Sequence, residues 1–259
     1  RLTGGEDIAV SNEIALLKQK FEVKVLFFDN TIKNYFKQIF WFLLNSNTES
    51  NNKVKKILKE FSPDIAYVHN TWFKGSLGIF RILKESNIST VLKLHNFRYY
   101  CTKSYTTKNH LINNHPCQAC GLNKHQLGLF NKYFQNSWLQ SLIVNRYGKK
   151  YFKIIKEQNI TILVLTKFHK RFLIELGIEN QRIKVLPNYI SVPEKKGERV
   201  VGDFLVYAGR ISPEKGVEEL INAFNNIENN KSVLKIIGVG PSYEDFKKKY
   251  ASEKIIFLG

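Results

Sequence analysis

Hydrophobic positions along the chain follow two spacings in turn, one typical of amphipathic helices and one typical of short buried strands. The helical spacing predicts helices at residues 6–20, 53–61, 77–85, 132–157, 167–176, 214–227 and 242–250. Short apolar runs predict strands at residues 21–28, 65–69, 90–94, 160–165, 183–186, 203–208, 233–237 and 254–258. Strands and helices in regular alternation indicate parallel βαβ units, so we expect an α/β fold. Because the strands are short and apolar, we expect each sheet to be covered on both faces.

A change of composition near residue 190 predicts a domain boundary. Pro187 and Pro193 bracket a short linker, and a charged cluster follows at residues 194–199. We therefore expect an N-terminal domain of residues 1–190 and a C-terminal domain of residues 191–259. The chain begins in mid-motif and ends in a predicted strand, so we expect a fragment that lacks the first strand of its first domain and part of its second domain.

The positive charge is concentrated in the first domain. Residues 1–187 hold 29 lysines and arginines against 12 acids, whereas residues 188–259 hold 11 against 10. The 71 residues between Glu85 and Glu157 contain no acid. A compositional bias toward lysine is one explanation of the positive charge, but such a bias would raise the lysine content of both domains. The distribution therefore predicts an anionic partner for the first domain.

A strand, a turn and a helix start follow one another at residues 205–217. The apolar run ends at Gly209-Arg210, Pro213 suits a first helical position, and Lys215 adds a second cation. A helix N-terminus offers free N–H groups and a positive dipole end, and an arginine grips two oxygens at once. This arrangement predicts a phosphate site, whereas a surface turn with a solvated arginine is the simpler alternative.

Several motifs resemble the family 4 glycosyltransferases of the GT-B fold. They are Leu186-Pro-Asn188-Tyr-Ile190, Tyr207-Ala-Gly-Arg210-Ile-Ser-Pro-Glu-Lys215-Gly-Val, Leu220-Ile-Asn-Ala-Phe224 and Leu234-Lys-Ile-Ile-Gly238-Val-Gly240-Pro. Near the front, Gly4-Gly5-Glu6 resembles the glycine loop of the family, and His95-Asn-Phe-Arg-Tyr99 resembles the segment with its acceptor-side histidine. The resemblance implies two Rossmann-like domains facing a cleft, the second of them incomplete here.

The resemblance also implies an activity and a set of residues. The activity is transfer of a sugar, with retention of configuration, from a nucleotide-diphosphate sugar to a glycan or lipid-linked acceptor, in cell-surface polysaccharide or glycolipid biosynthesis. No bound metal or other cofactor is expected, because cationic side chains stabilise the leaving diphosphate. The expected catalytic residues are His95, Arg210 and Lys215. The expected donor-binding residues are Gly4, Gly5, Asn188, Gly209, Arg210, Lys215, Gly238 and Gly240. The expected acceptor-side residues are His69, His95, Asn96 and Arg98.

Three cysteines leave two interpretations open. Cys117 and Cys120 form one Cys-x2-Cys pair, and Cys101 adds a third thiol with histidines nearby, so a zinc site is chemically feasible. A single pair in an irregular loop of an intracellular protein favours reduced free thiols instead.

Residues 31–44 predict a helix with one apolar face. Ile39, Phe40 and Leu43 share that face, and Lys33 and Lys37 lie opposite. Packing on the sheet and contact with an anionic membrane surface would both give this pattern. We expect a cytoplasmic protein, held at the inner face of the plasma membrane if the second explanation holds.

Two other functions fit part of the sequence. A GT-B sugar-nucleotide epimerase or a non-catalytic binder would use the same phosphate site. A basic nucleic-acid-binding protein with a zinc knuckle would use the positive charge and the cysteines but leave Arg210 and Lys215 unexplained. The acidic motif that contacts the donor in the family is absent, so the donor sugar cannot be identified and we expect the fragment to be inactive.

Overall fold

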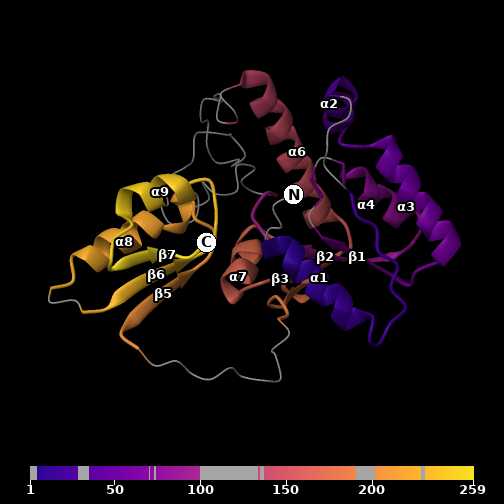
Figure 1. Ribbon diagram of the computed structural model, residues 1–259. Coiled ribbons are helices and arrows are strands. Elements are labelled where there is room, and N and C mark those ends of the chain that lie inside the picture. Colours follow the sequence, from indigo (N-terminus) through magenta and orange to yellow (C-terminus); the bar gives the residue numbers. More distant parts are fainter. Residues whose placement is uncertain are drawn as a thin grey trace. The chain divides into compact units, whose positions relative to one another are not determined.

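The computed structural model describes residues 5–28, 35–69, 71–72, 74–99, 134, 137–190, 202–228 and 231–259. The contacts between residues divide the chain into two compact units, Arg1–Val192 (unit 1) and Pro193–Gly259 (unit 2). Within the described residues, each unit is built on a parallel sheet of its own (Figure 1). The prediction of a mixed α/β fold with parallel strands is confirmed.

Unit 1 contains a four-stranded parallel sheet in the order β1-β2-β3-β4. The strands are β1 (Ile65–His69), β2 (Ser89–Leu94), β3 (Thr161–Val164) and β4 (Ile183–Val185). The helices are α1 (Gly5–Leu17), α2 (Tyr35–Leu44), α3 (Thr48–Phe61), α4 (Gly78–Glu85), α6 (Trp138–Glu157) and α7 (Lys167–Glu175), with a short 3-10 turn at Asn180–Arg182. The order of strands in space follows their order in sequence, and α4, α6 and α7 lie in the three crossovers.

Polar side chains define where three of these helices begin. The side chains of Asn47, Ser137 and Thr166 accept hydrogen bonds from backbone N–H groups in the first turns of α3, α6 and α7. Each cap satisfies a donor that the helix itself leaves without a partner. At the other end of α3, Ser62 takes a left-handed conformation with φ of 48° and directs the chain into the turn at Pro63.

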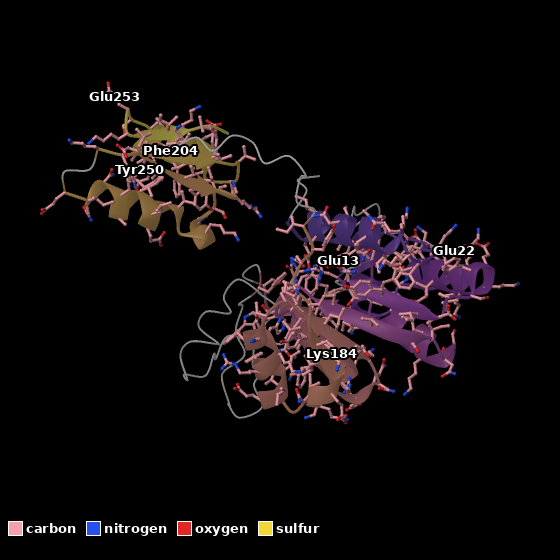
Figure 2. All side chains as sticks on the ribbon, turned by 90° about the horizontal axis from the view of Figure 1, so that it is seen from below. Glu13, Glu22, Lys184, Phe204, Tyr250 and Glu253 are labelled. Carbon is pink, nitrogen blue, oxygen red and sulfur yellow. The ribbon has the colours of Figure 1, made fainter. Side chains whose placement is uncertain are left out.

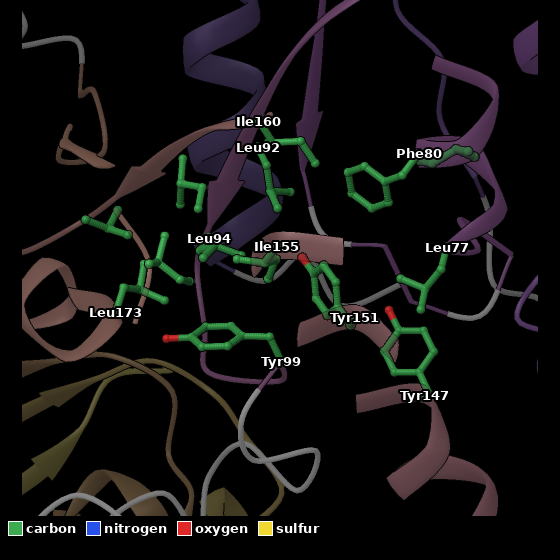
Figure 3. Close-up of a cluster of buried hydrophobic side chains, with 14 of the residues drawn as sticks. Leu77, Phe80, Leu92, Leu94, Tyr99, Tyr147, Tyr151, Ile155, Ile160 and Leu173 are labelled. Carbon is green, nitrogen blue, oxygen red and sulfur yellow. The ribbon is translucent and has the colours of Figure 1, made fainter. Parts of the chain in front are cut away.

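One face of the sheet of unit 1 carries the hydrophobic core. Leu92 and Leu94 of β2 pair in register with Ile162 and Val164 of β3, and all four side chains are buried. Figure 3 shows leucine, isoleucine and aromatic side chains from α4, α6 and α7 gathered around β2. The rings of Phe42 and Tyr147 are stacked with centroids 5.3 Å apart, which joins α2 to the same core.

Unit 2 contains the parallel strands β5 (Phe204–Ala208), β6 (Val233–Ile237) and β7 (Ile255–Phe257), in that order. Its helices are α8 (Val217–Asn225) and α9 (Tyr243–Tyr250), and a 3-10 turn at Pro213–Lys215 precedes α8. Leu234, Ile236, Ile255 and Phe257 pack against side chains of both helices. Both helices therefore cover the same face (Figures 1 and 2).

The expectation that each sheet is covered on both faces is wrong for the described part of unit 2. Val206, Ile237 and Ile256 are exposed, and Lys235 lies over the ring of Phe204 at 4.2 Å from its centroid. The strands contain apolar residues at almost every position, as strands buried on both faces do. Their composition therefore did not reveal that α8 and α9 pack on one side only.

The strand predicted at residues 21–28 is also not formed. The alternation of side chains is present, but a strand exists only as a member of a hydrogen-bonded ladder. No such ladder involves these residues in the described part of the chain, and Phe21 and Phe27 are 64% and 66% exposed. None of the described helices is both long enough and apolar enough to cross a membrane.

Candidate functional site

The carboxyl ends of β1 and β2 bring His69 and His95 together. His69, the last residue of β1, pairs in register with Lys93, and His95 is the first residue after β2. Nδ1 of His69 lies 3.0 Å from Nε2 of His95, and the two rings are stacked with centroids 5.3 Å apart. Two residues that the sequence assigns to the acceptor side therefore form one hydrogen-bonded pair.

The other predicted residues of this segment lie beside the pair. The side-chain N–H of Asn96 donates to Oε1 of Glu6 at 3.4 Å, and the backbone N–H of Arg98 donates to Oδ1 of Asn96 at 3.1 Å. The guanidinium of Arg98 lies over the Trp72 ring, 5.0 Å from its centroid. Asn96 thus connects the loop after β2 to the first turn of α1.

Gly5 is the first residue of α1, immediately before Glu6, whereas Gly4 lies outside the described residues. Asn188 is exposed in the segment after β4. Its neighbour Tyr189 accepts a hydrogen bond at its carbonyl oxygen from the side chain of Asn12, at 3.3 Å. This bond ties the segment that carries Asn188 to α1.

Sequence reasoning missed a buried polar cluster beneath the two histidines. Glu13 of α1 is labelled in Figure 2, and both of its carboxylate oxygens have partners. The hydroxyl of Tyr67 donates to Oε2 at 2.8 Å, and the fully buried ammonium of Lys93 donates to Oε1. The one available signal was Lys93 itself, because a lysine inside a short buried strand requires an anionic partner.

Burial keeps the two histidines of the pair neutral near pH 7. It is the main cause that lowers the pKa of His69 to about 4, with the neighbouring His95 and Lys93 acting in the same direction and Glu13 opposing them. Burial also lowers the pKa of His95, and Lys93 adds to this effect while Glu6 and Glu13 oppose it. Each ring therefore holds a single proton, and one of its nitrogens is free to accept a hydrogen bond.

A third histidine, His169 of α7, is buried in the core and was not a predicted site residue. Its Nε2 lies 2.9 Å from the hydroxyl of Tyr99, and its ring lies against Phe97 with centroids 4.3 Å apart. Burial lowers its pKa to about 4. The contacts of His169 are those of a structural histidine.

In unit 2 the predicted glycines hold two loops together. The backbone N–H of Gly209 donates to the carbonyl of Ile237, and that of Ile211 donates to the carbonyl of Val239, so the β5–β6 ladder continues into the loops. A Cβ atom on Gly238 would lie 2.0 Å from the Gly209 carbonyl oxygen, and one on Gly240 would lie 2.1 Å from that of Ile211. Glycine at these positions is therefore required by backbone packing.

Arg210 and Lys215 are both exposed in the loop between β5 and α8. The hydroxyl of Tyr207 donates to the Arg210 carbonyl at 3.0 Å and fixes the backbone at that point. The helix expected from residue 214 begins later, at Val217, because Gly216 takes a left-handed conformation with φ of 67° after the 3-10 turn. Lys215 is consequently the last residue of the 3-10 turn, and Gly216 separates it from α8.

Helix α8 has two acids in its first turn, Glu218 and Glu219. Glu218 accepts hydrogen bonds from the side chains of Lys249, at 3.0 Å, and Tyr250, which attaches α8 to α9. These contacts lower the pKa of the Glu218 carboxyl, chiefly through the bond from Tyr250. Arg210 and Lys215, the two cations of the predicted phosphate site, lie before this helix.

Cys101, Cys117 and Cys120 lie outside the described residues, so the zinc hypothesis stays untested. In the part of the chain that is described, no group of three or more histidine, cysteine or acidic side chains is arranged to hold a metal ion.

The parallel sheets of both units fit a Rossmann-like α/β fold. No protein-family profile matches the chain. The chain is 29% identical over 115 residues to YqgM of Bacillus subtilis (strain 168), an uncharacterized glycosyltransferase. The aligned segment covers 41% of this chain and 32% of that protein, so the chain spans about a third of the length of the relative it matches.

Two glycine variants test the backbone packing of the loops in unit 2. Gly216→Ala adds a Cβ that meets no clash, but it forces alanine into a left-handed backbone conformation. We expect it to lower the free energy of unfolding by about 1 kcal/mol. Gly238→Ala adds a clash with backbone, and we expect a loss of about 3 kcal/mol or more. Urea unfolding of the parent and both variants measures the difference. Equal losses would contradict the assigned packing.

The buried histidines predict a loss of stability in acid. For His69 and His169, the pKa of about 4 in the folded state lies below the ordinary value of 6.5, so the unfolded chain binds more protons between these values. Their contribution is complete above pH 6.5, and about 2 to 3 kcal/mol for each is lost as the pH falls to 4. Urea unfolding across this range measures the loss. His169→Gln keeps an amide beside Tyr99 without titrating, so its stability should decline less steeply than that of the parent.

Proposed function

We propose that this protein is a retaining glycosyltransferase of the GT-B type that moves a sugar from a nucleotide-diphosphate sugar to a glycan or lipid-linked acceptor. The observation that carries the proposal is the loop at residues 209–215 of unit 2. It presents two exposed cations, Arg210 and Lys215, at the carboxyl end of a parallel strand, where α/β sheets bind ligands. Similarity to a named glycosyltransferase supports glycosyl transfer in general.

The chemistry of the leaving group gives these cations a role. As the bond between the sugar and the diphosphate breaks, negative charge grows on the diphosphate. Arg210 can bind two of its oxygens in a fork, and Lys215 supplies a point charge. Both interactions strengthen as the charge develops, so they stabilise the transition state more than the bound substrate. Gly209, Gly238 and Gly240 hold the loop that carries Arg210 in its position.

Unit 1 would supply the acceptor side. The pair of His69 and His95, with Asn96 beside it, offers neutral nitrogen and amide groups, which suit the hydroxyls of a sugar. Gly4, Gly5 and Asn188 are proposed as further donor-binding residues, as the resemblance implies. The hydrogen bond from the Arg98 backbone to Asn96 holds Arg98 beside these groups, where we expect it to contact the same acceptor.

We also propose that unit 1 binds an anionic membrane surface through α2 and the beginning of α6. These helices contact each other (Figure 1), and six apolar side chains on the second half of α2 and the first turns of α6 are 37–62% exposed. The residues are Phe40, Leu43, Leu44, Trp138, Leu139 and Leu142. The core instead receives Phe42 from the opposite part of α2, so packing in the core does not account for the face that contains Phe40 and Leu43.

The charge near this apolar patch is positive. Lys37 is exposed on α2, and Arg146, Lys149 and Lys153 continue the exposed side of α6 beyond Leu142. An apolar patch that enters the interface and a cationic stripe that meets anionic headgroups are the two parts of an interfacial binding surface. A cytoplasmic, peripheral protein would meet a lipid-linked acceptor at such a surface, in polysaccharide or glycolipid biosynthesis.

Turnover and binding assays separate this proposal from its alternatives. A glycosyltransferase forms a new glycoside from donor and acceptor. A GT-B epimerase changes the donor without an acceptor, and a non-catalytic binder leaves it intact. A nucleic-acid-binding protein would bind oligonucleotides with an affinity that falls steeply with salt, without donor turnover.

Removing the guanidinium of Arg210 tests the donor site. We expect Arg210→Ala to lower kcat by about 100-fold with a smaller effect on KM, because the lost contact is strongest in the transition state. The matched control is Lys248→Ala, an exposed cation of α9 in the same unit. Transfer is measured on the full-length protein by release of the nucleoside diphosphate in a screen of nucleotide sugars. Unchanged kcat in Arg210→Ala would refute the assignment.

Binding to lipid vesicles tests the surface on α2 and α6. We expect the protein to sediment with vesicles that contain phosphatidylglycerol and to bind neutral phosphatidylcholine vesicles weakly. Leu139→Ser with Leu142→Ser should weaken binding by about tenfold or more, because apolar area no longer enters the interface. Ile227→Ser, which removes an exposed apolar side chain from unit 2, is the control. Equal binding by both variants would contradict the proposal.

A further inference from the structure

The ion pair of Glu13 and Lys93 lies in the interface between α1 and the sheet of unit 1. Lys93 is 0% exposed and Glu13 is nearly as well buried, and they come from segments 80 residues apart in sequence. A buried ion pair commonly gives less stability than two apolar side chains of the same size. Stability alone therefore does not explain why charges occupy this interface, and their neighbours suggest another role.

The neighbours of Glu13 lead to the histidine pair. Nε2 of His69 lies 3.9 Å from Oε2 of Glu13, and Nδ1 of the same ring lies 3.0 Å from Nε2 of His95. Lys93 and Tyr67 hold the two carboxylate oxygens, so the carboxylate has a fixed orientation. Glu13, His69 and His95 thus form a chain that runs from the buried interface to the carboxyl end of β2.

The charge of Glu13 determines where the protons of this chain lie. The distance of 3.9 Å between Nε2 of His69 and Oε2 of Glu13 is too long for a hydrogen bond, so the carboxylate acts on the ring through its charge. This charge favours the neutral His69 ring with its proton on Nε2, because the other tautomer places a lone pair nearest the carboxylate. Nδ1 of His69 is then the acceptor, so Nε2 of His95 must be the donor in the bond between the rings. Nδ1 of His95 is left without a proton. The same logic orients the histidine of a catalytic triad, where a buried carboxylate selects the tautomer.

We propose that Glu13 and His69 are positioning residues that hold His95 in the Nε2–H tautomer, so that its Nδ1 accepts a hydrogen bond from a substrate hydroxyl. This inference rests on the proposed function for the identity of the substrate, a sugar or a sugar acceptor. Lys93 and Tyr67 serve the chain by holding the carboxylate. The charged groups that act on His95 are Glu6 and Glu13 of α1 and Lys93 of β2.

The tautomers are measured directly by long-range ¹H–¹⁵N NMR of histidine-labelled protein at pH 7. In the parent we expect the proton of both rings on Nε2. Glu13→Gln keeps the size of the side chain but removes its charge, and we expect it to populate the Nδ1–H tautomer of His95. Tyr67→Phe removes a hydrogen bond from the same oxygen but leaves the charge, so the parent tautomer should persist. A parent His95 protonated on Nδ1, or a tautomer unchanged in Glu13→Gln, would overturn the proposal.

Kinetics give the second readout. We expect Glu13→Gln to lower kcat by about 10- to 100-fold while KM for the donor changes little, because the donor-binding cations are intact. If the full-length protein shows the expected tautomers but no glycosyl transfer, the proposed function fails and the positioning chain stands. If the parent transfers sugar and Glu13→Gln alters neither tautomer nor kcat, the chain fails and the proposed function stands.

Glu13→Gln leaves Lys93 buried with a neutral partner, and that variant can fold poorly for this reason alone. The double variant Glu13→Leu with Lys93→Met replaces both charges by apolar side chains of similar size. We expect its urea midpoint to lie near that of the parent, with the same change of His95 tautomer as Glu13→Gln. A stable double variant that retains the parent tautomer would refute the role of the carboxylate.

Discussion

Parallel strands can be neighbours only if the chain crosses back over the sheet between them, and this constraint organises both units. Every crossover returns the chain to the same end of the sheet, so the carboxyl ends of successive strands lie side by side. In unit 1 this arrangement brings His69 and His95 within hydrogen-bonding distance. In unit 2 it brings the loops at Gly209 and Gly238 into backbone contact. The candidate chemistry of each unit lies where the topology gathers these ends.

The two faces of the sheet in unit 1 serve different purposes. The face with Leu92 and Ile162 is apolar and packs against helices in the ordinary way. The face under α1 carries Tyr67 and Lys93, which meet a carboxylate. Consecutive residues of one strand, Leu92 and Lys93, therefore contribute to a hydrophobic core on one side and to an arrangement of charges on the other.

Much of the fold could be predicted because the local pattern of apolar and turn residues determines where most helices and strands form. The bounds of β1 and β6 agree with the predicted ones, since short apolar runs between turn residues leave few alternatives. Failures occurred where a distant partner decides. Residues 21–28 have the alternation of a strand but lack a ladder, and the uncovered face of the sheet in unit 2 depends on where two helices pack.

The candidate site divides in the same way. The positions of His69 and His95 at strand ends were visible in sequence, because strand ends are places where ligands bind. Glu13 was not, because its partner Lys93 lies 80 residues away and only the packing of α1 brings them together. The start of α8 was also not predictable from the local pattern, because the left-handed conformation of Gly216 makes the helix begin after Lys215.

The backbone bonds that continue the β5–β6 ladder into the loops have a consequence for how this protein can vary. The loop of Arg210 and the loop of Gly238 share hydrogen bonds and leave no room for a side chain between them. An insertion or a bulkier residue in one loop would displace the other. Among related sequences, the lengths of the two loops should therefore change together or not at all, although they belong to different turns of the chain.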